Sequence, residues 1–219
     1  MTKEEYIRKI KEKDTWAPGW EAIDKEFARL YPEGEEAHYA TALWARARLG
    51  GTEYLDGYSV YKNKNGHFHL VTYGMSNLYA DEEAFGAEYS GFGYEMTIRL
   101  KEERAEDCLW AMDMMSNLAR YTNETGFYFK NGDFVIGNGM PIHIGTDSMI
   151  TGLVIVNDVG AKTLDTLHGK LEFLQLVGVT TQEINAIRED PDNFEKLLEL
   201  MRRDNPELIT DTKRTKSYL

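Results

Sequence analysis

The stretch at residues 171–180, Leu-Glu-Phe-Leu-Gln-Leu-Val-Gly-Val-Thr, constrains the fold of this chain more than any other. In an extended conformation, Leu171 and Phe173 point to one face, whereas Leu174 and Leu176 point to the other. A short run that is apolar on both faces is typical of a strand that is covered on both sides. The rest of the chain must therefore supply a layer of structure on each face of this strand.

The residues at the end of this run predict a change from strand to helix. Gly178 is a turn signal that closes the strand, and residues 180–183, Thr-Thr-Gln-Glu, have the spacing of a capping box. We therefore expect a helix to about Glu189. A second helix is expected after Asp190-Pro191, because apolar residues then recur at helical spacing. These residues are Phe194, Leu197, Leu198 and Met201.

The remaining sequence alternates between helical and extended patterns. Helices are expected from Pro18 to about residue 30 and over residues 106–122. Strands are expected at residues 38–41, 58–61, 68–73, 92–100, 149–156 and 208–210. This order of elements predicts one α+β domain.

Two Asn-Gly pairs and one alternating segment give more detailed expectations. Asn65-Gly66 and Asn131-Gly132 each lie between two short apolar runs, which predicts a β-hairpin at each pair. In residues 92–100 every second side chain is apolar, which predicts a strand with one buried and one solvated face. The positions expected on the solvated face are Gly93, Glu95, Thr97 and Arg99.

Length and composition predict one domain with a substantial core. The chain has 219 residues, 42% of them hydrophobic, and no internal repeat or linker rich in Gly, Ser or Pro. We expect a single domain over residues 1–219, with its core at about 16–212. Residues 1–15 are expected to be a charged lead-in, and residues 213–219 a polar tail.

The sequence also indicates a cellular compartment. No run approaches the roughly 18 apolar residues of a membrane-spanning helix, and the N-terminus lacks the apolar region of a signal peptide. Cys108 is the only cysteine, so an intramolecular disulfide is excluded and a place in the core is expected. These features predict a cytoplasmic location, and no motif indicates a cofactor.

The charge distribution bears on possible partners. A net charge of −12 argues against a general nucleic-acid binder, which needs a basic face. Half of this charge lies in residues 81–107, which contain nine acidic and three basic residues. This region is either a solvated acidic face or a patch that attracts a basic protein partner.

Few residues are candidates for chemistry. His67 and His69 share one face of a predicted strand and could begin a metal site, but the spacing indicates no third ligand and favours surface histidines. Asp165 and His168 could pair as a base and its orienting group, but their position before a strand favours solvated turn residues. No catalytic motif of a known class occurs, so the sequence predicts no enzyme.

A set of motifs that keep their order along the chain resembles the Suppressor of fused family. The resemblance runs from about Trp20 to Arg214, and the ordered set is specific although each motif is weak. The motifs are Leu30-Tyr-Pro32, Leu55-Asp56, Tyr61-Lys-Asn63, His67-Phe-His69, Tyr73-Gly-Met-Ser-Asn-Leu-Tyr79, Ser90-Gly-Phe-Gly-Tyr-Glu-Met-Thr-Ile-Arg-Leu-Lys101, Leu118-Ala-Arg-Tyr121, Phe173-Leu-Gln-Leu-Val-Gly-Val-Thr180 and Leu208-Ile-Thr-Asp211.

The resemblance implies a fold and a mode of action. The fold would be a single α+β domain with a mixed, mostly antiparallel central sheet flanked by helices, and it would bind proteins without catalysing a reaction. In the animal relatives a second domain follows, and the two domains clamp an extended peptide of a Gli-type transcription factor as an added β-strand. This chain ends before any second domain, so we expect half of the clamp to be missing.

The resemblance also implies two site residues. Residues that contact the peptide in the animal relatives match Tyr121 and Asp133 here. Each has a plainer interpretation. Tyr121 lies on the apolar face of a predicted helix and could be a core residue with its hydroxyl at the edge. Asp133 follows the Asn-Gly pair of a predicted turn and could be only a turn residue.

Three hypotheses for the function follow. The first is a non-enzymatic, immunity- or antitoxin-like protein that binds and neutralises a partner toxin, as is thought for some members of the bacterial branch of the family. The acidic balance fits a basic toxin domain as that partner. The second is a regulator that sequesters a transcription factor or another protein through an extended peptide. The third is a metal-dependent hydrolase that uses His67 and His69.

Overall fold

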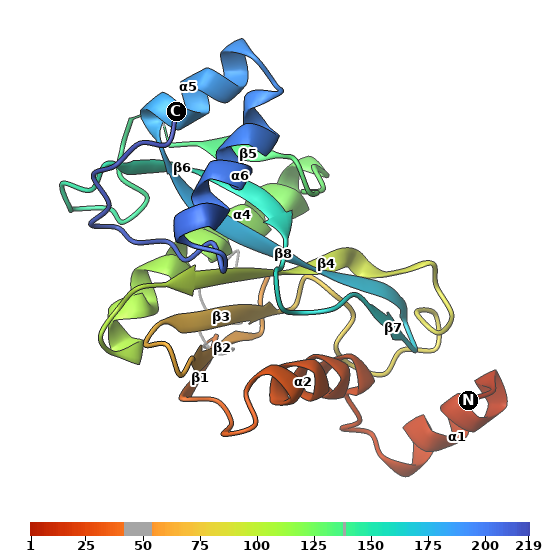
Figure 1. Ribbon diagram of the computed structural model, residues 1–219. Coiled ribbons are helices and arrows are strands. Elements are labelled where there is room, and N and C mark those ends of the chain that lie inside the picture. Colours follow the sequence, from red (N-terminus) through yellow and green to blue (C-terminus); the bar gives the residue numbers. More distant parts are fainter. Residues whose placement is uncertain (42–53, 138) are drawn as a thin grey trace.

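The computed structural model describes residues 1–41, 54–137 and 139–219, and Figure 1 shows their arrangement. The expected continuation of the first strand into residues 42–44 and the chain break at Gly50-Gly51 lie outside the described residues. The strands of the described part are β1 Ala37–Ala40, β2 Gly57–Lys62, β3 Phe68–Tyr73, β4 Tyr89–Leu100, β5 Phe134–Ile136, β6 Ile150–Asn157, β7 Leu164–Thr166 and β8 Gly169–Thr180. The helices are α1 Lys3–Glu12, α2 Pro18–Leu30, α4 Leu109–Thr125, α5 Thr181–Glu189 and α6 Asn193–Asp204, and a 3-10 turn, η1 Ala105–Cys108, precedes α4.

The strands form one mixed sheet in the order β1-β2-β3-β4-β8-β6-β5, with β7 paired to β8. The β4–β8 pair is parallel, whereas the other neighbouring strands pair antiparallel. The expected α+β domain with a mixed, mostly antiparallel central sheet is confirmed.

The strand expected at residues 171–180 is the centre of the molecule, as β8. Leu171 and Phe173 pack in the cluster that contains α2, whereas Leu174 and Leu176 pack on the opposite face in the cluster that contains α4. Further along, Val177 and Val179 pack against α5 and α6. Figure 1 shows α4 on one face of the sheet and α2, α5 and α6 on the other. Both predicted layers are therefore present.

Several local predictions are confirmed. Thr180 and Glu183 form the predicted capping box at the start of α5, and Pro18 begins α2. Asn65-Gly66 joins β2 and β3 in an antiparallel hairpin. Cys108 is buried, as expected for a small core residue.

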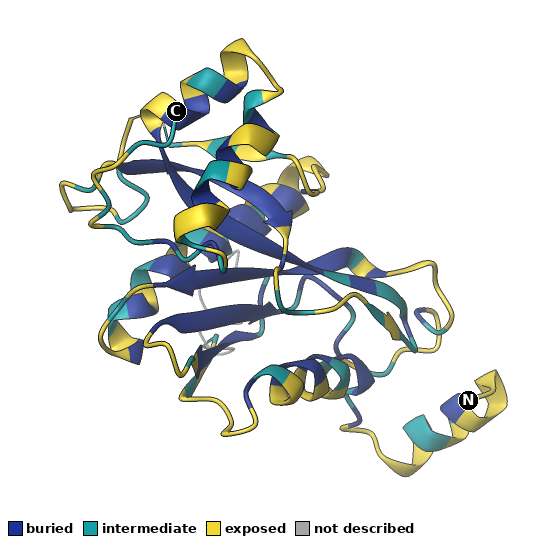
Figure 2. Ribbon diagram, in the orientation of Figure 1, coloured by how far each residue is buried: buried dark blue, intermediate teal, exposed yellow. Residues whose placement is uncertain are grey.

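The predicted solvated face of residues 92–100 is wrong. These residues lie in β4, and Figure 2 shows the strand buried along most of its length. Glu95 and Arg99 have 0% and 3% of their surface exposed. Alternation of polar and apolar residues predicts a solvated face only when nothing covers the polar side, and here β4 lies in the middle of a sheet that has helices on both faces.

Two turn or strand predictions also need correction. Gly178 does not end β8, which continues to Thr180. A Cβ atom at Gly178 would lie 2.6 Å from a methyl group of Thr210 and 2.6 Å from one of Ile150, so glycine allows the C-terminal segment to approach the strand. The expected strand at 208–210 is a single bridge, which joins Thr210 to Leu100.

The predicted hairpin at Asn131-Gly132 is also wrong. Residues 127–129 form no strand, and β5 pairs with β6 instead of folding back on them. The Asn-Gly pair still lies in a turn, because Asp133 N donates to Lys130 O. An Asn-Gly pair thus identified the turn and not the partner of the strand that follows it.

Both terminal segments are attached to the domain. In α1, Tyr6 is fully buried, and its hydroxyl lies 2.7 Å from Nε2 of His168. The predicted solvated position of His168 is therefore wrong, whereas Asp165 is exposed as expected. In the C-terminal tail, Arg214 makes two hydrogen bonds with the buried carboxylate of Glu183, at 2.7 and 2.9 Å.

Candidate functional site

The strand β5 lies at one end of the sheet and exposes one of its edges (Figure 1). On its inner side, Gly137 N donates to Thr151 O at 2.9 Å. Because hydrogen-bonded positions alternate along an antiparallel pair, the backbone groups of Phe134 and Ile136 point outward, away from β6. Within the described residues no strand pairs with this side, so β5 presents donors and acceptors that an added strand could use.

Large apolar side chains are exposed around this edge. Tyr121 at the end of α4 is 47% exposed, and its ring contacts Phe127 and Phe129 at centroid distances of 5.9 and 6.0 Å. Phe129 is buried and supports the two outer rings. The exposed aromatic residues Tyr121, Phe127 and Tyr128 are called the aromatic rim, and Phe134 and Ile136 of β5 are exposed as well.

The helix α4 faces this region with a separate stripe of side chains. Its buried residues form one stripe: Ala111, Met112, Met115, Leu118, Ala119 and Thr122. Trp110, Met114, Asn117 and Tyr121 follow one another at intervals of four, three and four residues, so they form a second stripe. Tyr121 therefore lies on this outer stripe, and its interpretation as a core residue is wrong.

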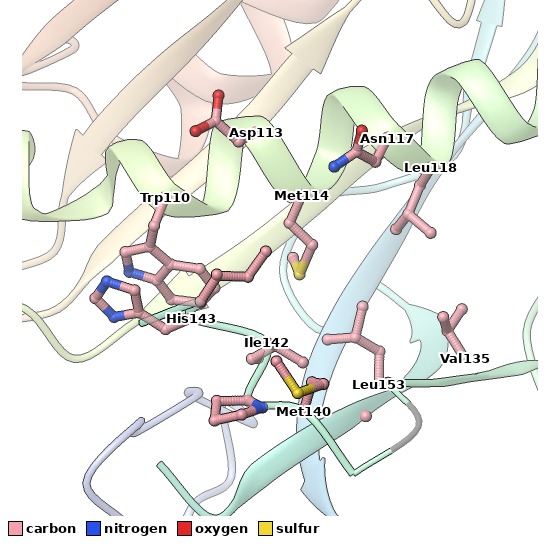
Figure 3. A pocket seen from close by; sticks show the side chains of 14 residues that line it. Trp110, Asp113, Met114, Asn117, Leu118, Val135, Met140, Ile142, His143 and Leu153 are labelled. Carbon is pink, nitrogen blue, oxygen red and sulfur yellow. The ribbon is translucent and has the colours of Figure 1, made fainter. Parts of the chain in front are cut away.

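A cavity of about 440 Å³ lies between the outer stripe of α4 and the edge of the sheet. In Figure 3, Met114 and Leu118 project from the helix toward Leu153 and Val135, Trp110 projects toward His143, and residues 140–144 close another side. Trp110 stacks on His143 with a centroid distance of 4.8 Å and an interplanar angle of 9°. The lining is mainly apolar.

Asp133 precedes β5 and is tied into the turn before it. Its Oδ2 accepts a hydrogen bond from Lys130 N at 2.9 Å, and its carbonyl oxygen accepts one from Ile155 N at 2.8 Å. The side chain is half-buried. Asp133 is thus a turn residue, as the plainer interpretation of the sequence suggested. It also lies at the start of the free edge.

The two histidines of the metal hypothesis are buried, so the prediction of surface positions is wrong. The ring nitrogens of His69 lie 2.9 Å from Asp158 Oδ2 and 2.8 Å from the hydroxyl of Tyr31. Burial raises the pKa of Tyr31 to about 12 and lowers the pKa of His69, so a neutral tyrosine can donate to a neutral imidazole. Both nitrogens of His69 are therefore engaged within the core.

The other histidine offers no better metal ligand. His67 is 2% exposed, and its Nδ1 lies 3.7 Å from a carboxylate oxygen of Glu207. Burial lowers its pKa to about 4. Within the described residues, no group of three or more His, Cys, Asp or Glu side chains could hold a metal ion. The contacts of His67 and His69 therefore do not support the hydrolase hypothesis.

The acidic region at residues 81–107 is not one patch. The strand β4 separates its exposed acids into one group before Tyr89 and another after Leu100, and β4 spans 12 residues, or roughly 40 Å. Glu95, between the two groups, is buried. The exposed acids of residues 81–107 are therefore dispersed.

Among the described residues, no helix combines the length and the apolar character of a membrane span.

Sequence reasoning missed most of this site. Tyr121 and Asp133 were expected, and they lie at the end of α4 and at the start of β5. Phe134 and Ile136 were assigned to a hairpin strand, whereas Trp110 and Met114 fell within the predicted helix at residues 106–122 and were given no role. The short Phe-Val-Ile run signalled a strand, but no local pattern states that a strand will be the last one in its sheet.

Comparisons with known proteins agree on one family. Residues 51–215 match the model of the Suppressor of fused protein family. The chain is 35% identical over 213 residues to the Suppressor of fused homolog of Homo sapiens, a match that covers 90% of this chain and 43% of that protein. The chain thus spans less than half the length of this relative.

Solved structures give the same result at the level of the fold. The crystal structure of a Sufu–Fu complex contains a chain that matches with a TM-score of 0.77 and 25% identity, over 92% of this chain and 93% of that one. A Suppressor of fused homologue from Neisseria gonorrhoeae matches with a TM-score of 0.60 over 92% of this chain and 97% of that one. Its identity of 12% shows similarity of fold alone.

Proposed function

This chain belongs to the Suppressor of fused family, and we propose that it is a non-enzymatic protein-binding domain that takes an extended segment of its partner along β5. The observation that carries this proposal is the free edge of β5, with outward backbone groups at Phe134 and Ile136 beside the aromatic rim. An exposed edge of this kind binds a peptide by forming main-chain hydrogen bonds, while neighbouring side chains supply specificity. The similarity to a chain solved as part of a Sufu–Fu complex supports a protein as the ligand.

The charge of the chain favours a basic partner. With a net charge of −12, the domain attracts cationic surfaces at long range. A basic toxin domain fits this requirement, and we propose an immunity- or antitoxin-like role in which the chain binds and neutralises such a toxin. Binding of an extended peptide fits equally a regulator that sequesters another protein, and the identity of the captured partner separates the two roles.

The first prediction concerns the free edge. The Ile136→Pro variant lacks one outward N–H and places a ring on the edge, while the inward hydrogen bonds of β5 remain. We expect this variant to bind peptides selected on the wild-type chain from a random displayed library at least about tenfold more weakly. Fluorescence anisotropy with the synthetic peptides measures the change.

A matched variant tests whether the backbone matters. Ile136→Thr shortens the same side chain but keeps the N–H, so it should lose much less affinity than Ile136→Pro. Thermal melting of both variants shows whether each is folded. Equal binding by Ile136→Pro and the wild-type chain would rule out strand addition at β5.

The second prediction concerns Tyr121 and Asp133. Tyr121→Ala removes half-exposed aromatic surface, and we expect it to weaken binding to a basic partner captured from cell lysate by about tenfold. Tyr121→Phe keeps the ring and should bind much as the wild-type chain does. Asp133→Asn keeps an oxygen that can accept from Lys130 N but removes the charge.

The charge variant gives a separate readout. If Asp133 attracts the partner, Asp133→Asn binds more weakly at low salt, and the difference shrinks when salt is added because exposed charges are then screened. Affinities that are unchanged in both Tyr121→Ala and Asp133→Asn would exclude these two residues from the binding site.

A further inference from the structure

The register of β5 determines where the side chains of an added strand would point. Val135 packs with the cluster under α4 and lies opposite Leu153 of β6. Its neighbours, Phe134 and Ile136, point to the other face of the sheet. A partner residue placed opposite Val135 lies on the same face as Val135, because directly opposed residues in paired strands project together. Its side chain therefore points toward α4.

The cavity described above lies on that face of the sheet. Val135 itself lines it, together with Leu153 from β6 and Met114 and Leu118 from α4 (Figure 3). Its volume of about 440 Å³ lies within the range of ligand pockets, about 300–1,000 Å³, and is ample for one large side chain. An added strand would thus place every second side chain on the cavity's face of the sheet.

The charges around the cavity limit the chemistry of its occupant. Asp113 is the one carboxylate among the described lining residues, which include no lysine or arginine. In Figure 3 its carboxylate points away from the cavity, so it lies at the rim. Asp133 stands at the beginning of the same edge. An apolar side chain suits the interior, and cationic residues elsewhere in the segment suit Asp113 at the rim and Asp133 at the start of the edge.

We propose that this cavity is the specificity pocket for one large apolar residue of the partner segment, paired opposite Val135, with lysine or arginine elsewhere in the segment. The inference rests on the proposed strand addition at β5 and deepens it by naming the chemistry of the segment. Strand pairing supplies the main-chain contacts, and the cavity selects the central side chain.

Selection from a random displayed peptide library tests this inference with the full chain as bait. Enriched peptides should share one large apolar position together with basic residues. Replacing that apolar residue by serine in a synthetic peptide should weaken binding by about tenfold or more, because the buried apolar area is lost.

Variants of Met114 provide the matching change on the protein. Met114 is partly exposed and lines the cavity, so Met114→Lys puts a charge into the pocket without altering the deep core. We expect Met114→Lys to bind the selected peptides at least about tenfold more weakly. Met114→Leu keeps the apolar character and should bind within a few-fold of the wild-type chain.

The outcomes separate this inference from the proposed function. If Ile136→Pro abolishes binding but the serine peptide and Met114→Lys bind normally, strand addition stands and the pocket assignment is wrong. If Ile136→Pro binds normally, strand addition is wrong and the pocket assignment falls with it. A wild-type dimer in sedimentation experiments that Met114→Lys dissociates would place a second copy in the cavity and overturn the inference.

Discussion

Asp158→Asn is expected to lower the free energy of unfolding by about 3–5 kcal/mol, because it leaves the buried guanidinium of Arg99 without its counter-charge. Asp158 is buried after β6, and each carboxylate oxygen accepts three hydrogen bonds. Oδ2 accepts from His69, Thr97 and Arg99, and Oδ1 accepts from Arg99, Gly160 N and Ala161 N. An asparagine cannot accept from both sides, since one of its terminal atoms is a donor.

Urea denaturation of the wild-type and variant chains measures the loss. Asp165→Asn is the matched control, because Asp165 is exposed and its replacement should change stability by less than about 0.5 kcal/mol. A loss of less than about 1 kcal/mol in Asp158→Asn would mean that the network contributes little beyond filling its volume.

The same substitution should change the dependence of stability on pH. Burial disfavours the charge of Asp158, but His69 and Arg99 outweigh burial and hold the pKa well below its ordinary value. A carboxyl with a lowered folded-state pKa contributes stability above its unfolded pKa of about 3.9, and this contribution is lost as the pH falls below that value. The acid-side decline in stability should therefore be shallower in Asp158→Asn than in the wild-type chain.

The second large effect is expected at the attachment of the C-terminal tail. Glu183→Gln should lower the free energy of unfolding by about 3–5 kcal/mol, because Glu183 is fully buried and its partner Arg214 is largely buried. The carboxylate of Glu183 also accepts hydrogen bonds from Thr180 N and Tyr218 N. It thus joins the start of α5 to the tail.

A double variant separates the ion pair from the rest of the site. Glu183→Gln and Arg214→Gln each leave one charged residue without its counter-charge. The double variant removes both charges, so it should lose less stability than the two single losses added together. Glu199→Gln is the matched control, because its ion pair with Arg203 is exposed and should contribute less than about 1 kcal/mol. Additive losses in the double variant would show that Glu183 and Arg214 are not coupled.

Both predictions concern charged residues that sequence analysis did not place in the core. Arg99 was expected on a solvated face, and Arg214 in a polar tail. Their partners are far away in the sequence: Asp158 lies 59 residues from Arg99, and Glu183 lies 31 residues from Arg214. A charge is stable in the interior only beside such partners, and no local pattern in the sequence reveals them.

The sequence by itself determined the local elements and the central strand. The two-faced apolar run at 171–180, the capping box at Thr180 and the hairpin at Asn65-Gly66 depend on contacts within a few residues, so they could be found without a structure. The ordered motifs determined the family for a similar reason, because they are local strings of residues. Tyr121 and Asp133 entered as candidates through those motifs.

Only the tertiary structure decided which surfaces were free. It placed β5 at the end of the sheet, turned Tyr121 outward on a second stripe of α4, and divided the acids of residues 81–107 between the two ends of β4. It also buried His67 and His69, which sequence analysis had placed on the surface. The physical reason is that exposure depends on what packs against a residue, and in a sheet with a parallel crossover those neighbours come from distant parts of the chain.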